Sequence, residues 1–226
     1  MRRPVGGVSR VVDRKVSLSL GQEIPKAFQW YQQARNPMRL LQRELLVQAC
    51  KGRYILDIGG GTGRTADVLG KLGHDVVVVD LDQERIKFGK RSVQALFVRA
   101  DGYRLPFADA TFDEVVLEEI LEHLEDQKAF ISEAYRVLRP AGRIILSTPN
   151  RWPFRIYVFL LRLATVNFRM LFEHVGSHIA EVNASELEFL FAQCRKRKIV
   201  GINPFAEALA NRWPSFGIGL LGIFTK

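Results

Sequence analysis

The chain has 226 residues, of which 47% are hydrophobic and 25% are charged, and its formal net charge is +9. This size and composition are ordinary for one soluble globular domain with a full core. Two cysteines, Cys50 and Cys194, have no metal-binding spacing and exclude a disulfide framework, which favours a reducing compartment such as the cytoplasm. The positive charge predicts an acidic partner, either nucleic acid or an anionic membrane surface.

The first segment, residues 1–25, is predicted to be a basic N-terminal arm. It lacks the apolar core of a signal peptide, and an organelle transit peptide is the alternative interpretation. Lys26 to Cys50 then has helical periodicity, broken at Pro37. We expect one domain over residues 26–226.

Apolar runs that read as strands follow, and they alternate with segments of helical spacing. Seven such strands predict an α/β, Rossmann-like sheet that is doubly wound and parallel. Ligands of such sheets bind at the carboxyl ends of the strands. The predicted strands are Arg53 to Ile58, Asp75 to Asp80, Ala95 to Arg99, Phe112 to Leu117, Gly142 to Thr148, Lys198 to Asn203 and Ile218 to Thr225.

The first predicted strand runs into three alternating glycines, Gly59, Gly61 and Gly63, which allow a tight backbone turn against a nucleotide. The second strand ends at Asp80, whose carboxylate can accept two hydrogen bonds from a ribose diol. The glycine spacing alone would also suit a dehydrogenase that binds NAD. Asp57 argues against NAD, because a carboxylate here would repel a pyrophosphate but suits a ligand with sulfonium and ammonium groups.

Three further motifs follow in order, each at the end of a strand-like run: ADGYRLPFADATFDEVV at 100–116, LEHLED at 121–126 and VLRPAGRIILSTPN at 137–150. With these motifs, the chain from about Phe28 to Lys226 resembles a class I S-adenosylmethionine-dependent methyltransferase. It departs from the family at Ala141, where a glycine is usual. The resemblance implies an antiparallel last strand and an N-terminal helix over the cofactor site.

The same resemblance implies a role for each cofactor-binding residue. Gly59, Gly61 and Gly63 would line the methionine part of S-adenosylmethionine, with Asp57 and Glu118 nearby. Asp80 would bind the ribose, Leu81 the adenine face, and Asp101 with Gly102 the adenine edge. For Asp101, the alternative is an acid that only forms a turn.

The segment 118–126 carries five acidic residues and no lysine or arginine. In a helical turn, Glu119, Glu122 and His123 would share one face and could reach a single cation. Alternatively, Glu118, Glu119, Glu125 and Asp126 face water at a helix start, and His123 packs beside the cofactor.

This motif, with Ser147 to Arg151 and Gly176 to His178, looks like the O-methyltransferases of ubiquinone biosynthesis. That resemblance implies that Glu119, Glu122, His123 and His178 bind a divalent cation such as Mg²⁺, which would acidify a phenolic hydroxyl. The alternative for His178 is a hydrogen-bonded loop histidine. Without a metal, His123 is the candidate general base.

Residues 152–172 are mostly apolar, and Arg155, Arg162 and Arg169 are spaced by seven, which places them on one helical face. We expect an amphipathic helix within an insertion at about 151–178. It is either a lid over an apolar substrate or a contact with an anionic membrane surface.

The basic run from Arg195 to Lys198 reads as a solvated helix end or as a binding patch. Nucleic-acid methyltransferases that modify exocyclic amines usually show Asn or Asp-Pro-Pro-Tyr after the fourth strand, where this chain has Leu117-Glu118-Glu119-Ile120. The sequence therefore argues against a nucleic-acid substrate.

The favoured function is O-methylation of a lipophilic phenol or quinone precursor. Alternatives are methylation of another small molecule or a glycan, a non-catalytic cofactor-binding module, and a Rossmann dehydrogenase.

Overall fold

The computed structural model describes residues 37–156, 180–203 and 213–226. The predicted N-terminal arm, most of the predicted amphipathic segment and His178 lie outside these residues. The description below therefore concerns the sheet, its helices and the loops at the strand ends.

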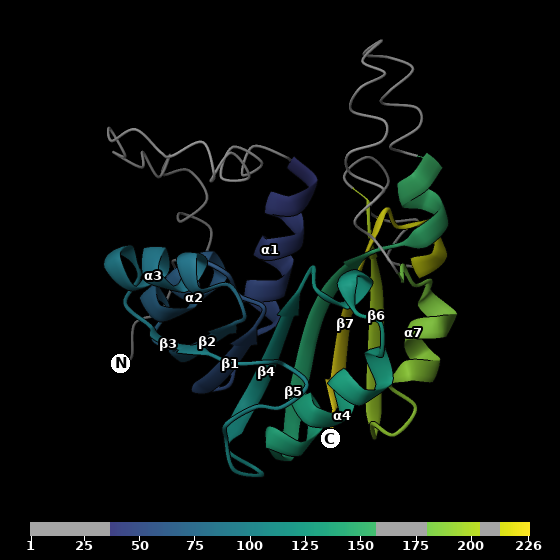
Figure 1. Ribbon diagram of the computed structural model, residues 1–226. Helices are drawn as coiled ribbons and strands as arrows, with labels where there is room; N and C mark the ends of the chain where they lie inside the picture. Colours follow the sequence, from purple (N-terminus) through teal and green to yellow (C-terminus); the bar gives the residue numbers. More distant parts are fainter. Residues whose placement is uncertain (1–36, 157–179, 204–212) are drawn as a thin grey trace, which may run out of the picture. The chain divides into compact units, whose positions relative to one another are not determined.

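Seven strands form one sheet in the order β3-β2-β1-β4-β5-β7-β6 (Figure 1). Strands β1 to β5 pair in parallel, and β7 is antiparallel to both of its neighbours. The predicted fold class and its antiparallel last strand are thus confirmed. A dinucleotide-binding sheet has the parallel order 3-2-1-4-5-6, so the insertion of β7 between β5 and β6 distinguishes this fold from a Rossmann dehydrogenase. The strands are β1 Tyr54–Ile58, β2 Asp75–Asp80, β3 Leu96–Arg99, β4 Phe112–Glu118, β5 Leu138–Pro149, β6 Lys196–Ile202 and β7 Gly219–Thr225.

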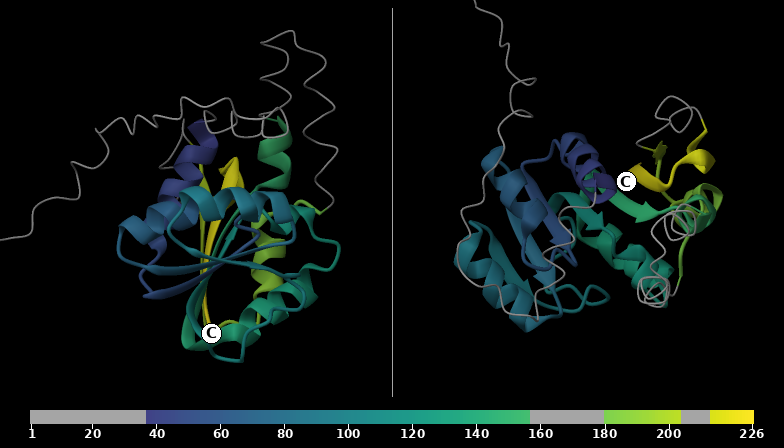
Figure 2. Two further views of the ribbon diagram at one scale, coloured as in Figure 1. Left: turned by 60° about the vertical axis from the view of Figure 1, so that its left-hand side comes forward. Right: turned by 90° about the horizontal axis from the view of Figure 1, so that it is seen from above.

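The sheet is covered on both faces, which explains why its central strands are buried almost throughout. Because side chains alternate along a strand, Ile55 of β1 joins one apolar cluster and Leu56 joins the other. Helices lie on both faces of the sheet (Figure 2). The first cluster includes residues of α1, α2 and α3, and the second includes residues of α4 and α7. The helices are α1 Pro37–Ala49, α2 Arg64–Lys71, α3 Gln83–Ser92, α4 Gln127–Val137 and α7 Ala184–Leu190, with short 3₁₀ helices η2 Leu121–His123 and η3 Pro214–Phe216.

Most strand boundaries differ from the sequence prediction by one residue, and two strands, β5 and β6, begin earlier by more than that. Strand β5 begins at Leu138, before the predicted start at Gly142, because Leu138 already pairs with Phe112. The ladder is irregular after this pair, and Ala141 lies in the left-handed region with φ +63°, where the usual family glycine would carry no strain.

The second difference concerns the basic run. Lys196, Arg197 and Lys198 lie in β6, at the edge of the sheet, rather than at a helix end. All three side chains are exposed. Charged residues on an edge strand discourage pairing with a second chain, so the run has a structural explanation in this position.

Candidate functional site

The turn after β1 is built from glycines in left-handed conformations: φ is +75° at Gly59, +57° at Gly61 and +77° at Gly63. Such values strain residues that carry a Cβ. A Cβ at Gly59 would lie 2.2 Å from Ile120 Cδ1, and one at Gly63 would lie 2.6 Å from Phe97 Cζ. At Gly61 the nearest atom would be 3.7 Å away. Gly59 and Gly63 thus permit close packing, while Gly61 leaves room for a ligand to approach the backbone.

Asp80 lies beside this turn at the end of the neighbouring strand. Its Oδ2 accepts a 2.9 Å hydrogen bond from the Gly61 N–H, and its Oδ1 accepts a 2.8 Å bond from the Asp82 N–H. Leu81, which follows, is 63% exposed although it is a large apolar residue. The structure therefore places a fixed carboxylate and an open apolar surface side by side, as the binding of a ribose and an adenine requires.

The end of β3 supplies the third predicted position. Asp101 is exposed, and its Oδ1 accepts a 2.9 Å hydrogen bond from the Tyr103 N–H, so it does form a turn. Gly102 is buried, and a Cβ there would lie 2.3 Å from Phe130 Cε2. Close packing against Phe130 explains why position 102 is a glycine. The adenine contact of both residues stays a prediction.

Asp57 is a buried carboxylate beneath the glycine turn. Only 1% of the residue is exposed, and neither carboxylate oxygen has a hydrogen-bond partner among residues 37–156, 180–203 and 213–226. Burial, followed by the nearby charge of Glu118, raises the pKa of Asp57 to about 8. An orphaned carboxylate at this place fits a ligand that brings positive charge, as the methionine end of S-adenosylmethionine would.

Helix α1 contributes residues that the motif analysis did not identify. Arg43 forms an ion pair with Glu118, with an N–O distance of 2.8 Å, and its Nε donates a 3.0 Å hydrogen bond to Thr65 Oγ1. Thr65 in turn donates to Glu118. Gln42 Nε2 donates a 3.1 Å bond to Glu119 Oε1. The helix before β1 thus reaches the strand ends, and the polar pair Gln42 and Arg43 on the side of the helix that also carries the apolar Leu46 and Val47 was the available signal.

The predicted arrangement of the acidic motif is wrong in one respect. Glu119 does not share a helical turn with Glu122 and His123, because it precedes η2 and has φ +51°. A non-glycine residue in this region is strained, and such strain is typical of functional sites. Loss of water around its carboxyl group, followed by the charge of Glu122, raises the pKa of Glu119 well above its ordinary value.

The alternative in which the acids of this motif face water at a helix start holds for Glu125 and Asp126, which are exposed, whereas Glu118 and Glu119 are half-buried. Glu122 is 1% exposed, and its Oε2 accepts a 3.1 Å hydrogen bond from Thr148. Asp126 caps α4 by accepting from the Ala129 N–H, as acids at helix starts do. His123 is exposed, and its Nε2 lies 4.0 Å from Glu122 Oε1. The motif therefore presents an accessible imidazole above a buried carboxyl group.

The described residues do not form the predicted metal site by themselves. In the part of the chain that the structure describes, no three histidine, cysteine or acidic side chains are grouped so that they could hold an ion. The fourth predicted ligand, His178, lies outside that part. The cation stays a prediction.

The start of the predicted insertion is helical at 151–156. Arg155 does not join a free polar face there, because its Nε pairs with Glu181 Oε2 at 2.7 Å. The other two arginines of the predicted stripe lie outside the described residues. No helix within the described ranges is long and apolar enough to span a membrane.

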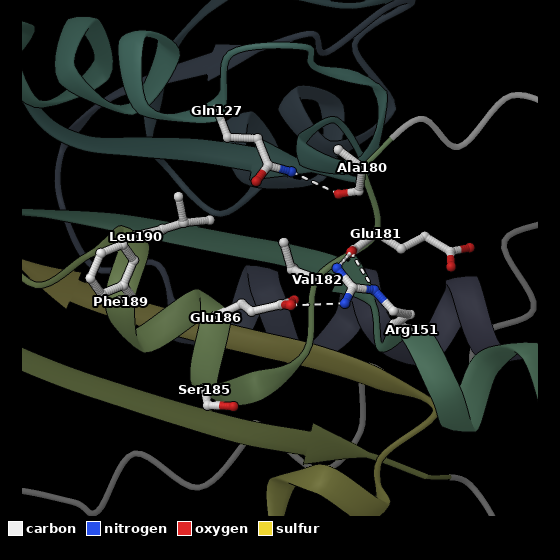
Figure 3. Close-up of a pocket in the computed structure, with 9 residues that line it drawn as sticks. All are labelled: Gln127, Arg151, Ala180, Glu181, Val182, Ser185, Glu186, Phe189 and Leu190. Carbon is white, nitrogen blue, oxygen red and sulfur yellow. Dashed lines mark hydrogen bonds and ion pairs between the residues drawn. The ribbon is translucent and has the colours of Figure 1, made fainter.

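A pocket of about 420 Å³ lies beside this helix, between Arg151, the start of α4 and α7 (Figure 3). Arg151 donates to the Glu181 carbonyl oxygen and pairs with Glu186 at 2.8 Å. Gln127 Nε2 donates to the carbonyl oxygens of Leu121 and Ala180. Elements of the α4 and α7 face form this pocket, whereas α1 and the glycine turn are on the other side.

Known proteins resemble both the sequence and the fold. Residues 56–146 match a family described as a methyltransferase domain. The chain is 39% identical over 131 residues to a demethylmenaquinone methyltransferase of Beutenbergia cavernae, which covers 55% of each protein. It is 33% identical over 127 residues to a ubiquinone biosynthesis O-methyltransferase of Xanthomonas oryzae pv. oryzae, covering 53% of this chain and 52% of that protein. The chain thus spans about half the length of these curated relatives.

A solved structure agrees over nearly the whole chain. The crystal structure of a SAM-dependent methyltransferase from Archaeoglobus fulgidus superposes with a TM-score of 0.63 at 19% identity, covering 89% of this chain and 100% of that one. At this identity the likeness shows a shared fold. The matched residues 56–146, the strand order and the glycine turn beside Asp80 agree with those of class I S-adenosylmethionine-dependent methyltransferases.

Proposed function

We propose that the chain binds S-adenosylmethionine and transfers its methyl group to a small, lipophilic acceptor. The observation that carries this proposal is the turn after β1, where left-handed glycines lie between the fixed carboxylate of Asp80 and the orphaned carboxylate of Asp57. The first carboxylate suits a ribose diol, and the second suits positive charge. A nicotinamide dinucleotide would instead bring a pyrophosphate to this turn.

The residues of the site would act mainly by positioning. The bound cofactor supplies a methyl group activated by a sulfonium, and in-line transfer then depends on how donor and acceptor are held. Asp80 is already oriented by two backbone N–H groups, and Leu81 offers its exposed side chain to an adenine face. The open side of Gly61 leaves space for the methionine part.

The acceptor that we propose is a phenol or quinone precursor, methylated on oxygen. The acidic motif and the Ser147 to Arg151 strand end resemble ubiquinone O-methyltransferases, and two of the curated relatives are named for menaquinone and ubiquinone substrates. A phenolic hydroxyl must lose a proton during transfer. We assign that role to His123, because its ring is accessible and lies next to the strand ends.

The experiment that tests this proposal identifies the methyl acceptor in a cell extract. A cell extract is incubated with isotopically labelled S-adenosylmethionine, with and without the purified protein, and labelled products are identified by mass spectrometry. We expect a labelled, apolar phenol ether that depends on the protein. A labelled glycan or polar metabolite would overturn the acceptor assignment, and protein that binds the cofactor but labels nothing would be a regulatory module.

The role of His123 is tested with the same assay. His123→Gln should lower the rate of transfer by about 10²-fold, which is the lower range for loss of a general base. His74→Gln is the matched control, because His74 precedes β2 at the opposite end of the strands. Equal activity of the two variants would remove His123 from the reaction.

The metal proposal is tested separately. If Glu119, Glu122, His123 and His178 hold a cation, EDTA should abolish transfer and Mg²⁺ should restore it. Glu122→Gln should weaken the dependence on Mg²⁺, because one charged ligand oxygen is gone. Full activity in EDTA, with no ion bound to the protein, would leave His123 to act as a base without a metal.

A further inference from the structure

The carboxyl group of Asp57 has an environment that disfavours its negative charge. It is 1% exposed, and neither oxygen accepts a hydrogen bond from the part of the chain that the structure describes. The glycine turn covers it, since a Cβ at Gly60 would lie 2.4 Å from Asp57 Oδ2. A buried carboxylate without a partner is costly, so such a group tends to take up a proton.

Charged neighbours of Asp57 change how strongly its carboxyl group binds a proton. Asp80 on β2 and Glu118 on β4 both raise its proton affinity, and Arg43 on α1 opposes them. Both Asp80 oxygens accept backbone N–H bonds, and Glu118 has Arg43 at 2.8 Å. Asp80 and Glu118 thus have hydrogen-bond or ion-pair partners, whereas Asp57 has none among the described residues.

One further titratable group faces this cluster. Cys50 follows α1, and burial, then the charge of Glu114, raises the pKa of its thiol, so it remains neutral near pH 7. It therefore cannot supply a charge that would hold Asp57 ionised. Asp57 is thus the buried carboxyl group of this cluster that has no hydrogen-bond partner among the described residues.

We propose that Asp57 carries a proton in the free protein and releases it when the positively charged methionine end of the cofactor occupies the glycine turn. The inference rests on the proposed function, because the cofactor's ammonium and sulfonium groups supply the charge. The O–H bond of the carboxyl group breaks, the proton passes to solvent, and no bond to the cofactor forms. The carboxylate left behind is stabilised by the nearby positive charge.

The result is a cofactor affinity that depends on pH. Because burial and the charge of Glu118 raise the pKa of Asp57 to about 8, nearly every free molecule carries the proton at pH 7. Binding must then remove it, and by linkage the association constant rises about tenfold for each unit of pH below that pKa.

Calorimetric titration with S-adenosylhomocysteine, which carries the ammonium group and cannot react, tests this between pH 5.5 and 7. In this range the amino group of the ligand stays protonated. We expect a tenfold gain in affinity per pH unit. Titrations in two buffers of different ionisation enthalpy should show release of close to one proton per ligand at pH 7.

Two variants locate the proton. Asp57→Asn keeps the shape of the side chain without its titration, and its affinity should be independent of pH with no proton released. Glu188→Gln is the matched control, because Glu188 is an exposed acid on α7, on the opposite face of the sheet. It should keep the wild-type pH dependence.

Each outcome is decisive. Wild-type binding without proton release, or proton release that persists in Asp57→Asn, would overturn the inference and leave the proposed function intact. Failure of wild-type protein to bind S-adenosylhomocysteine or S-adenosylmethionine at any pH would overturn the proposed function itself. If Asp57→Asn does not fold, infrared difference spectra of the wild type should show a protonated carboxyl band that disappears on binding, and its persistence would refute the proposal.

Discussion

At the level of single residues, Asp80 makes the most direct prediction. Its carboxylate is buried to 8% exposure and is oriented by backbone N–H groups toward the glycine turn. Asp80→Ala should weaken S-adenosylmethionine binding by roughly 1.5–3 kcal/mol, because charge-assisted hydrogen bonds to the ribose are lost. Calorimetric titration of the wild type and the variant measures this loss of affinity. The same titration of the wild type with NAD should show no binding.

Asp75→Ala is the control for Asp80, because it removes an exposed carboxylate at the other end of the same strand. It should bind the cofactor as the wild type does. An Asp80→Ala variant with wild-type affinity would mean that the ribose lies elsewhere.

Asp57 also predicts how stability depends on pH. Its pKa is about 8 in the folded protein against an ordinary value of 3.8, so between these values the folded state binds more protons than the unfolded state. Stability is therefore full below about pH 4 for this group and is lost as the pH rises toward 8. We expect the free energy of unfolding of the cofactor-free protein to fall across this range, on the order of a few kcal/mol.

Urea unfolding at a series of pH values measures this effect. In Asp57→Asn the decline between pH 5 and 8 should be smaller than in the wild type, since position 57 no longer titrates and only other groups with a raised pKa, such as Glu119, still contribute. A wild-type protein that gains stability over the same range would contradict the assignment.

At the level of elements, a side chain added to a glycine can cost backbone strain alone or strain together with a steric clash. Gly63 in the glycine turn and Gly73 after α2 allow the two costs to be compared. Gly63 and Gly73 both have positive φ, +77° and +95°. A Cβ at Gly63 would meet Phe97 Cζ at 2.6 Å, whereas a Cβ at Gly73 would meet no atom within 4 Å. Gly73→Ala should cost about 1–2 kcal/mol from backbone strain alone.

Gly63→Ala should cost about 1–3 kcal/mol more than Gly73→Ala, because overpacking adds to the strain. Chemical denaturation of both variants gives the difference. Equal losses would show that Phe97 can move aside, and that the turn tolerates more bulk than its packing suggests.

The helix at 151–156 bears on the membrane proposal. Trp152 is 61% exposed and Ile156 is 57% exposed, and both lie at the start of the predicted amphipathic segment, residues 152–172. We propose that this segment contacts an anionic membrane. Trp152→Ser should then weaken binding to anionic liposomes roughly tenfold, because burial of an aromatic side chain contributes about 1.5–3 kcal/mol.

The control is Phe189→Ser, which removes a side chain that is 68% exposed on α7. It should leave liposome binding unchanged, and added salt should weaken binding of both proteins. If the wild type ignores liposomes of every composition and still methylates a soluble acceptor, the segment is a substrate lid.

At the level of the whole molecule, local patterns predicted the strands but not every boundary. Strand β2 lies at Asp75–Asp80, as expected, because charged residues bound a run of valines. Strand β5 begins earlier than expected because Pro140, Ala141 and Gly142 read as a turn, although the structure continues the strand through them. A pairing partner distant in sequence decides such a boundary.

The residues of the candidate site also differ in whether the sequence alone predicts them. Gly59, Gly61, Gly63 and Asp80 were predictable, because one short motif places them at adjacent strand ends. Arg43 was not, since its contact with Glu118 depends on how α1 packs against β4. The helical spacing assumed for Glu119 was wrong because a single left-handed residue interrupts it.

The position of β7 has a consequence for biosynthesis. Strand β6 is translated before β7, yet its partner in the sheet is β7, which itself pairs with β5. A nascent chain must therefore hold β6 unpaired until the following strand emerges, while β1 to β5 can already associate. An unpaired strand invites association with other nascent chains, and the basic run from Arg195 to Lys198 is carried by the segment that must wait. The charges of this run would keep the incompletely folded sheet soluble while the chain is still attached to the ribosome.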